Sequence, residues 1–381
     1  MRIRLEPELE ALRAAVDGQA ARTVAPLAEK VDRGQAFSPE LWAAVRDIGL
    51  TRLPFAEEHG GEGGTVRAYV VATREVARHS PVGALYPGTT IQVAMTLLQH
   101  GTPEQVARWV PRLVSGESVA SWAFTEPATG SDPRQITTRA ERTDAGWRLT
   151  GAKQFISFAG QADVALVFAR TSETALGAFL VDTTDPAWSV GEPSEVLSMG
   201  GTEARPVALD GVLAEGLVGP VDGGFDVMIA GEAFGKLRAA TISAGIAARA
   251  LEEASAYALT REHRGTPIGR KFPTIQALLG KAAASTLAAE SLLLTCADLL
   301  DRKQSVPAEA ASARLVSGRA AREATEAALH VCGAYGLTKD MVVERLYREA
   351  VFFDVSQGVT EIQQVIVARE LLAEAAKSGR A

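Results

Sequence analysis

Apolar residues recur at two different spacings along the chain, and the spacing changes twice. Up to about Gly116 the spacing is helical, from about Glu117 to Val221 it is that of strands, and from about Gly223 onward it is helical again. No helix-length stretch separates the expected strands, which favours an antiparallel sheet over βαβ units. The pattern predicts an α+β fold, mainly α, with a helical domain over residues 1–117, a β-domain over 118–222 and a helical bundle over 223–381.

Local signals place individual elements within these regions. Thr102 is expected to cap a helix over residues 103–113, because proline suits the first helical position. The stretch 79–88 contains two prolines and is expected to be a loop. Strands are predicted at 146–150, 164–169, 178–181 and 207–209, and long helices at 226–261, 274–300, 307–333 and 359–377.

Composition excludes several classes of protein. The 381 residues carry 39 Lys and Arg against 46 Asp and Glu, and the net charge of −7 argues against a nucleic-acid partner. Cys296 and Cys332 lie in apolar stretches, so a disulfide framework is not expected and a reducing, cytoplasmic compartment is. No apolar run reaches the ~20 residues of a membrane span, and residues 1–9 do not have the pattern of a signal peptide. The histidines are not spaced as metal ligands, so no metal site is expected.

The segment 122–132 carries the most specific candidate chemistry. Its sequence predicts a strand that runs into a tight loop, where the Thr125 hydroxyl, the backbone N–H groups around Gly130, and Ser131 are available as donors. Such a loop can bind a flavin's pyrimidine edge or a phosphate; alone, the same segment would be read as a solvated turn. A hairpin over 146–157 follows, and strand alternation is expected to place Phe155 and Ser157 on one face.

Together these two segments resemble the acyl-CoA dehydrogenase family of flavoproteins. Further similar segments follow the family's order along nearly the whole chain: 54–61, 199–219, 223–225, Arg261 before Gly265, 333–336 and 347–370. The resemblance implies an N-terminal helical domain, a central antiparallel β-domain and a C-terminal four-helix bundle. It also implies FAD as cofactor, an acyl thioester of CoA or of a carrier protein as substrate, an electron acceptor that the sequence does not identify, and a homodimer or homotetramer.

The resemblance also implies roles for individual residues. Trp122, Thr125, Phe155 and Ser157 would line the flavin ring, and Gly130 and Ser131 would lie near the phosphates of the cofactor or of the substrate's pantetheine. Arg261 would reach the FAD pyrophosphate of a neighbouring subunit. Gly333, Ala334 and Gly336 would approach that pyrophosphate through bare backbone. His330 stands before this turn, where the family usually has Gln.

The base of the family's reaction is altered in this sequence. In the family, a carboxylate takes the α-proton of the thioester while the β-hydrogen leaves as hydride. The usual base is a Glu directly before Gly-Thr, and the matching residue here is Gln357. A subset of the family carries its Glu before the arginine that matches Arg238, and here that residue is Leu237. Arg238 itself is expected either near the thioester or in a salt bridge of the bundle.

An amide is not a base near neutral pH, and general-base help is worth roughly 10²–10⁴-fold in rate. The sequence leaves four explanations open. The base is displaced, although neither Asp354 nor Glu361 is an obvious replacement; the scaffold serves a monooxygenase or oxidase; the chain is a non-catalytic subunit of a heteromer; or a natural Glu has been exchanged for Gln357 by engineering.

Overall fold

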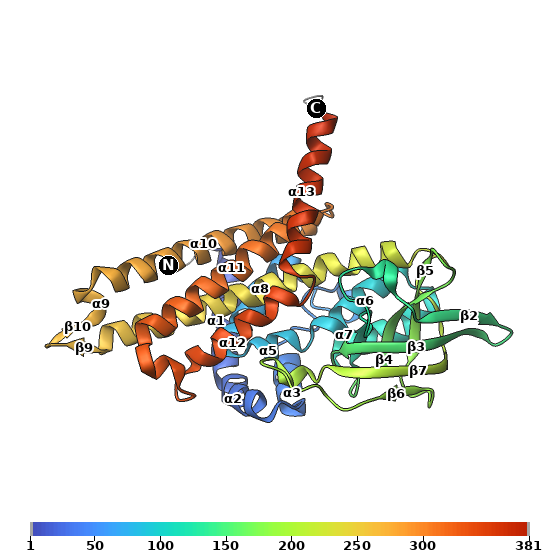
Figure 1. Cartoon of the computed structure of the whole chain (residues 1–381), viewed down its shortest axis with the longest axis horizontal. Helices are drawn as coiled ribbons and strands as arrows, with labels where there is room; N and C mark the ends of the chain where they lie inside the picture. Colours follow the sequence, from blue (N-terminus) through green and yellow to red (C-terminus); the bar gives the residue numbers. More distant parts are fainter. Residues whose placement is uncertain (1–2, 379–381) are drawn as a thin grey trace. The chain divides into compact units, whose positions relative to one another are not determined.

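The computed structural model describes residues 3–378 and forms two compact units (Figure 1). One unit comprises the described residues of Met1–Ala28, Thr65–Ala84 and Lys236–Ala381, and the other comprises Glu29–Gly64 and Leu85–Gly235. Residues 1–2 and 379–381, the ends of the expected first and third domains, lie outside the described residues.

An eight-stranded sheet forms the centre of the second unit, with strand order β6-β7-β3-β2-β4-β5-β8 and β1 paired to β4. The strands are β1 Ala120–Ala123, β2 Arg139–Thr143, β3 Gly146–Ile156, β4 Val164–Arg170, β5 Leu176–Asp182, β6 Trp188–Val190, β7 Arg205–Leu213 and β8 Gly216–Leu217. All four predicted strands are present, as parts of β3, β4, β5 and β7. The continuous apolar run of β4 is buried from Val164 to Ala169, as expected for a strand covered on both faces.

The sheet is not the purely antiparallel one that the sequence had suggested, because β2 pairs in parallel with β4 at Arg139 and Arg170, and β1 does so along its whole length. The residues of β1 pair with those of β4 from Ala120 opposite Val164 to Ala123 opposite Val167. Parallel neighbours need a long connection. The chain supplies one through the β2–β3 hairpin, which stands between β1 and β4 in sequence, rather than through a helix.

Helices α3 (Pro39–Asp47), α6 (Gly88–His100) and α7 (Pro103–Ser115) also belong to the second unit, and α2 (Ala25–Gly34) crosses its boundary. The predicted cap of α7 is confirmed, since the Thr102 hydroxyl accepts from the Gln105 N–H and the Gln105 side chain accepts from the Thr102 N–H. The loop predicted over 79–88 is wrong. Ser80 accepts from the Gly83 N–H and starts α5 (Pro81–Leu85), because proline is compatible with a first helical turn.

The first unit is helical. It contains α1 (Pro7–Thr23), α4 (Val66–His79), most of α8 (Gly224–Thr260), α9 (Ile268–Lys271), α10 (Pro273–Asp301), α11 (Pro307–Cys332), α12 (Val342–Val355) and α13 (Thr360–Lys377), with a short ribbon of β9 (Glu262–His263) and β10 (Thr266–Pro267). The four predicted long helices are confirmed, whereas α12 was not predicted. Small residues bring α8 and α4 together: a Cβ at Gly245 would lie 2.5 Å from the Cβ of Ala77. Figure 1 shows α10 and α11 side by side, and α13 begins beside α11.

Helix α10 is long and apolar enough to cross a membrane by length and composition alone. The core helix of a helical bundle meets the same criteria. Because α10 packs along α11 and α4, its composition is weak evidence for a membrane span.

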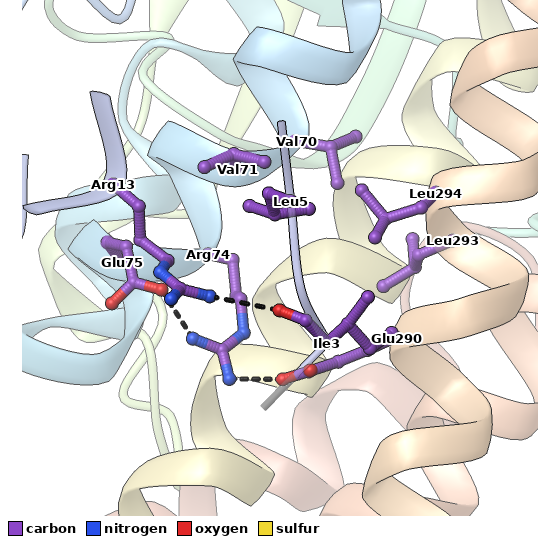
Figure 2. Close-up of a pocket in the computed structure, with 10 residues that line it drawn as sticks. All are labelled: Ile3, Leu5, Arg13, Val70, Val71, Arg74, Glu75, Glu290, Leu293 and Leu294. Atoms are coloured by element: carbon purple, nitrogen blue, oxygen red, sulfur yellow. Dashed lines mark hydrogen bonds and ion pairs between the residues drawn. The ribbon is translucent and has the colours of Figure 1, made fainter. Parts of the chain in front are cut away.

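Buried charges link the helices of the first unit (Figure 2). The Arg74 guanidinium contacts Glu75 on its own helix and Glu290 on α10. Arg78, one turn further along α4, lies 2.7 Å from Glu252 of α8. A cavity of about 30 Å³ beside Arg74, lined partly by Ile3 and Leu5, has room for about one water molecule. This cavity contains none of the predicted site residues.

Candidate active site

The loop that follows β1 carries the first group of predicted site residues. Trp122 packs on Phe168 of β4 with ring centroids 5.0 Å apart, and its indole N–H is buried without a hydrogen-bond partner among residues 3–378. Thr125 is the second residue after the end of β1. A backbone bridge between Glu126 and Thr129 closes the turn, which leaves Gly130 and Ser131 exposed.

The end of β3 lies against this loop. The Gln154 N–H donates to the Thr125 carbonyl at 2.9 Å, and the Ser121 hydroxyl donates to the Ser157 carbonyl at 2.9 Å. These bonds bring the ends of β1 and β3 together and, with them, four of the predicted site residues: Trp122, Thr125, Phe155 and Ser157.

The prediction that Phe155 and Ser157 share one face assumed regular alternation along β3. This assumption is wrong at the end of the strand. The register with β7 shifts between Lys153 and Ile156, and Phe155 has a left-handed backbone with φ 57°. A bulge of this kind redirects a side chain. Phe155 is 59% exposed, while Ile156 beside it is buried. An apolar ring is thus presented at the surface of the second unit.

A buried ion pair, which sequence reasoning missed, fixes the loop to the hairpin. Lys153 Nζ donates to Glu126 Oε1 at 2.9 Å, to the Phe168 carbonyl at 2.7 Å and to the Phe124 carbonyl at 3.2 Å. Both side chains are at most 1% exposed. The signal available was strand alternation, which places Lys153 on the same face as the buried Leu149; a lysine in that position needs a carboxylate partner.

Glu126 is held by five donors. Besides Lys153, its carboxylate accepts from the N–H and hydroxyl groups of Thr137 and Thr138 at 2.5–2.9 Å. Burial by itself would raise the pKa of Glu126, but the Lys153 charge and these hydrogen bonds outweigh burial and hold the pKa at about 2. The loop that carries Thr125 is therefore tied to an ionised carboxylate.

A second group of predicted residues lies in the first unit, where α11 ends. Gly333 follows the last residue of α11 with φ 60° and ψ −140°, and a Cβ built there would meet nothing within 4 Å. Ala334 and His330 are exposed, whereas Gly336 is buried against Cys332. Open backbone at Gly333 and Ala334 is accessible to a ligand. Arg261, directly after α8, has an exposed side chain that forms no ion pair among residues 3–378.

Gln357 lies in the turn between α12 and α13. Its backbone is left-handed with φ 55°, and its side-chain oxygen is buried without a hydrogen-bond partner among the described residues. Gln363 of α13 holds this turn, since its side-chain amide donates to the carbonyls of Gln357 at 3.3 Å and Gly358 at 3.2 Å. The backbone at Gly358 is left-handed with φ 79°, which favours glycine, and a Cβ there would lie 2.3 Å from that amide nitrogen and displace it.

The carboxylates beside Gln357 in sequence are not placed as bases. The Asp354 carboxylate is ion-paired with Arg322 of α11, and Glu361 is exposed on the first turn of α13. At the alternative base position, Leu237 is fully buried in α8. Arg238 is 1% exposed, and its charge acts on the buried hydroxyl of Tyr69 of α4, where it opposes the rise in the Tyr69 pKa that burial causes.

The residues within each unit fit a flavin nucleotide. The second unit offers an exposed aromatic ring at Phe155, an indole N–H without a partner at Trp122, and a loop of exposed backbone at Gly130 and Ser131. The first unit offers bare backbone after α11, of the kind that phosphates approach.

Comparison with known proteins identifies the family. Three protein-family models match this chain. The model of the acyl-CoA dehydrogenase N-terminal domain matches residues 6–117, that of the middle domain residues 121–212 and that of the C-terminal domain residues 222–372. An acyl-CoA dehydrogenase of Bacillus subtilis (strain 168) is 32% identical over 360 residues, which cover 93% of this chain and 95% of that protein. A 3-(aryl)acrylate reductase of Clostridium sporogenes (strain ATCC 15579) is 30% identical, with 93% and 95% covered. The structure of butyryl-CoA dehydrogenase from Megasphaera elsdenii superimposes with a TM-score of 0.93 at 26% identity and covers 98% of this chain and 100% of that chain.

The chain therefore belongs to the acyl-CoA dehydrogenase family. Its α+β, mainly α fold is that of the family, and it is a flavoprotein oxidoreductase with FAD as cofactor. These findings confirm the fold, enzyme class and cofactor that the resemblance implied. Oligomers are typical of the family.

Proposed function

We propose that the protein catalyses FAD-dependent oxidation of an acyl thioester between Cα and Cβ at a site whose usual base is replaced by Gln357. Family membership supports the reaction class. The turn at Gln357 supports the alteration, because residues 354–361 offer only the paired Asp354 and the exposed Glu361 as carboxylates. The thioester is carried by CoA or by a carrier protein.

The cofactor-binding residues follow from the resemblance and from their positions within each unit. Phe155 and Trp122 would pack on the flavin ring, and Thr125 and Ser157 would bond to its edge. Gly130 and Ser131 would lie near phosphates. Arg261, His330, Gly333, Ala334 and Gly336 would serve the pyrophosphate of a second subunit's FAD, so the proposal includes a homodimer or homotetramer. Exposed apolar side chains on α13, among them Leu371 and Leu372, support an assembled state.

The proposed chemistry separates binding from proton removal. FAD supplies the acceptor for the hydride that leaves Cβ. The Gln357 backbone N–H would donate to the thioester carbonyl and so acidify the α-proton, as the family's base residue does with its own amide. The Gln357 carboxamide does not take that proton near neutral pH. Arg238 of α8, whose buried charge acts on Tyr69, would lie near the thioester.

A monooxygenase or oxidase on the same scaffold is the second candidate. The observation that favours it is the lack of a carboxylate at both known base positions, Leu237 and Gln357, because oxygen chemistry does not require an α-proton base. The third candidate is a subunit that completes a partner's flavin site.

The buried, unpaired cysteines support a reducing compartment, the cytoplasm.

Anaerobic flavin bleaching by a panel of acyl-CoA and acyl-carrier thioesters tests the proposal. Wild type is expected to reduce its flavin slowly, and Gln357→Glu about 10²–10⁴-fold faster. Gln364→Glu makes the same charge change at an exposed position of α13 and is the matched control. A wild-type rate equal to that of Gln357→Glu would contradict the altered base. Oxygen uptake by the reduced protein without a thioester would favour the monooxygenase or oxidase. Flavin binding that occurs only with a partner chain would favour the subunit of a heteromer.

A further inference from the structure

A buried arginine lies behind the turn that carries residue 357. Arg314, on α11, is 1% exposed and is among the largest fully buried side chains of the chain. Its Nη2 donates to the Ser356 carbonyl at 3.2 Å, so it reaches the turn through the main chain of the residue directly before Gln357.

The charge of Arg314 is not balanced by an ion pair among residues 3–378. Asp354, the carboxylate whose charge it feels, is instead paired with Arg322, two turns further along α11. The Nε of Arg314 and the hydroxyl of Ser356 are both buried without hydrogen-bond partners. Burial lowers the pKa of Arg314 to about 10, with Asp354 opposing the change, and the group is still charged at neutral pH.

Helix α11 is shaped around this guanidinium. A Cβ at Gly318, one turn after Arg314, would lie 2.9 Å from Nη1. The glycine thus leaves the space that lets the side chain run along the helix toward Ser356. Isolated buried charges are strongly unfavourable, and the Ser356 carbonyl is the acceptor that this guanidinium reaches.

We propose that Arg314 is the positioning residue of the active-site turn. By donating to the Ser356 carbonyl from α11, Arg314 fixes the orientation of the Gln357 N–H and side chain. Gln363 holds the same turn from α13. This inference rests on the proposed function in one respect: residue 357 must face the thioester. Displacement of a reacting group by about 1 Å can lower a rate about 10²-fold.

The test compares Arg314→Met, Arg314→Lys and Gly318→Ala with Arg319→Met, which removes an exposed arginine from the same helix. The first measurement needs no substrate: amide exchange at Ile362 and Gln363, whose N–H groups bond to the Val359 carbonyl, in the FAD-loaded protein. Arg314→Met and Gly318→Ala are expected to speed exchange there at least tenfold, whereas Arg319→Met leaves it unchanged. Unchanged exchange in a folded Arg314→Met protein would overturn the proposal.

The second measurement is stopped-flow flavin reduction by an acyl-CoA in the Gln357→Glu background. Arg314→Met is expected to lower the limiting reduction rate about 10–100-fold with the thioester Kd within twofold, and Arg314→Lys to recover most of the rate. A rate equal to that of the Gln357→Glu parent, or equal losses in rate and binding, would overturn the positioning role. If the parent itself fails to reduce flavin, the proposed function fails, and the exchange measurement still decides the role of Arg314.

Discussion

The Lys153 ammonium lies 2.9 Å from Glu126 Oε1, and this ion pair joins the β3 hairpin to the loop after β1 in an environment closed to water. Removing one partner leaves the other buried without its countercharge. We therefore expect Lys153→Met or Glu126→Gln to lower the free energy of unfolding by roughly 3–5 kcal/mol, and the double variant to lose less than the sum of the two. Urea denaturation of each variant measures these differences.

The matched control is an exposed ion pair in the same unit. Arg33 and Glu29 form one on α2, with side chains 56% and 62% exposed. Arg33→Met is expected to change the unfolding free energy by less than about 1 kcal/mol. Equal losses for Arg33→Met and Lys153→Met would show that burial of the Lys153 pair has no energetic consequence.

Glu126 also makes stability depend on pH at the acidic end. Its pKa falls from an ordinary 4.5 to about 2 on folding, because Lys153 and the threonine hydrogen bonds outweigh burial. A carboxyl with a lowered native pKa stabilises the fold above its unfolded pKa. That stability is lost as pH falls from about 4.5 toward 2, at up to about 1.4 kcal/mol per pH unit. Between pH 5 and 3, wild type should lose more unfolding free energy than Glu126→Gln; equal losses in the two proteins would contradict this assignment.

Gly333 is predicted to resist substitution although it has free space around it. Its φ of 60° with ψ of −140° is a backbone conformation that side chains disfavour, and a Cβ there would meet nothing within 4 Å. Gly333→Ala should cost about 1–3 kcal/mol through backbone strain alone. Gly280, in the middle of α10 and also without neighbours within 4 Å, is the control, and Gly280→Ala should stabilise by up to about 1 kcal/mol. Thermal unfolding of both variants checks the sign, and stabilisation by Gly333→Ala would contradict the argument.

The helices were predictable wherever the apolar pattern was long. Helices α8, α10, α11 and α13 begin and end within two residues of the ranges expected from sequence. Helix α12 was missed, although its pattern was present: Val343, Leu346, Ala350 and Phe353 recur at helical spacing and are buried. Charged residues such as Arg348 lie between them, as is typical of an amphipathic helix.

Partners distant in sequence were not predictable, because no local pattern encodes them. The pairing of Lys153 with Glu126 depends on two strand ends that meet only in the folded sheet. The same holds for Arg78 with Glu252 and for Arg314 with the Ser356 carbonyl. The left-handed backbone at Phe155 also escaped prediction, since a bulge interrupts a strand without a marker such as glycine. The flavin-binding segments were identified by their resemblance to a family, not by periodicity.

Helix α13 is expected to contribute to assembly of the proposed oligomer. Leu371 and Leu372 are 64% and 67% exposed on α13, which extends away from α11 in Figure 1. If copies of the chain bury this face, Leu371→Ser with Leu372→Ser should shift the mass measured by light scattering toward the monomer. Leu259→Ser, which removes a 55% exposed leucine from α8, is the control. An unchanged mass for the double variant would exclude this face from the interface.

Phe155 is expected to affect flavin binding without affecting folding. Because Phe155 is 59% exposed, Phe155→Ala should change the unfolding free energy of the flavin-free protein by less than about 0.5 kcal/mol. Loss of an aromatic contact with the flavin ring, worth about 0.5–1.5 kcal/mol beyond apolar burial, should weaken FAD binding about tenfold. Phe155→Trp should retain the affinity, since the larger ring offers the same kind of face, and Val221→Ala, at another exposed apolar residue of this unit, should not change it. Titration of the flavin-free variants with FAD gives the Kd values. An affinity for Phe155→Ala within twofold of wild type would mean that the ring exposed by the β3 bulge does not contact the cofactor.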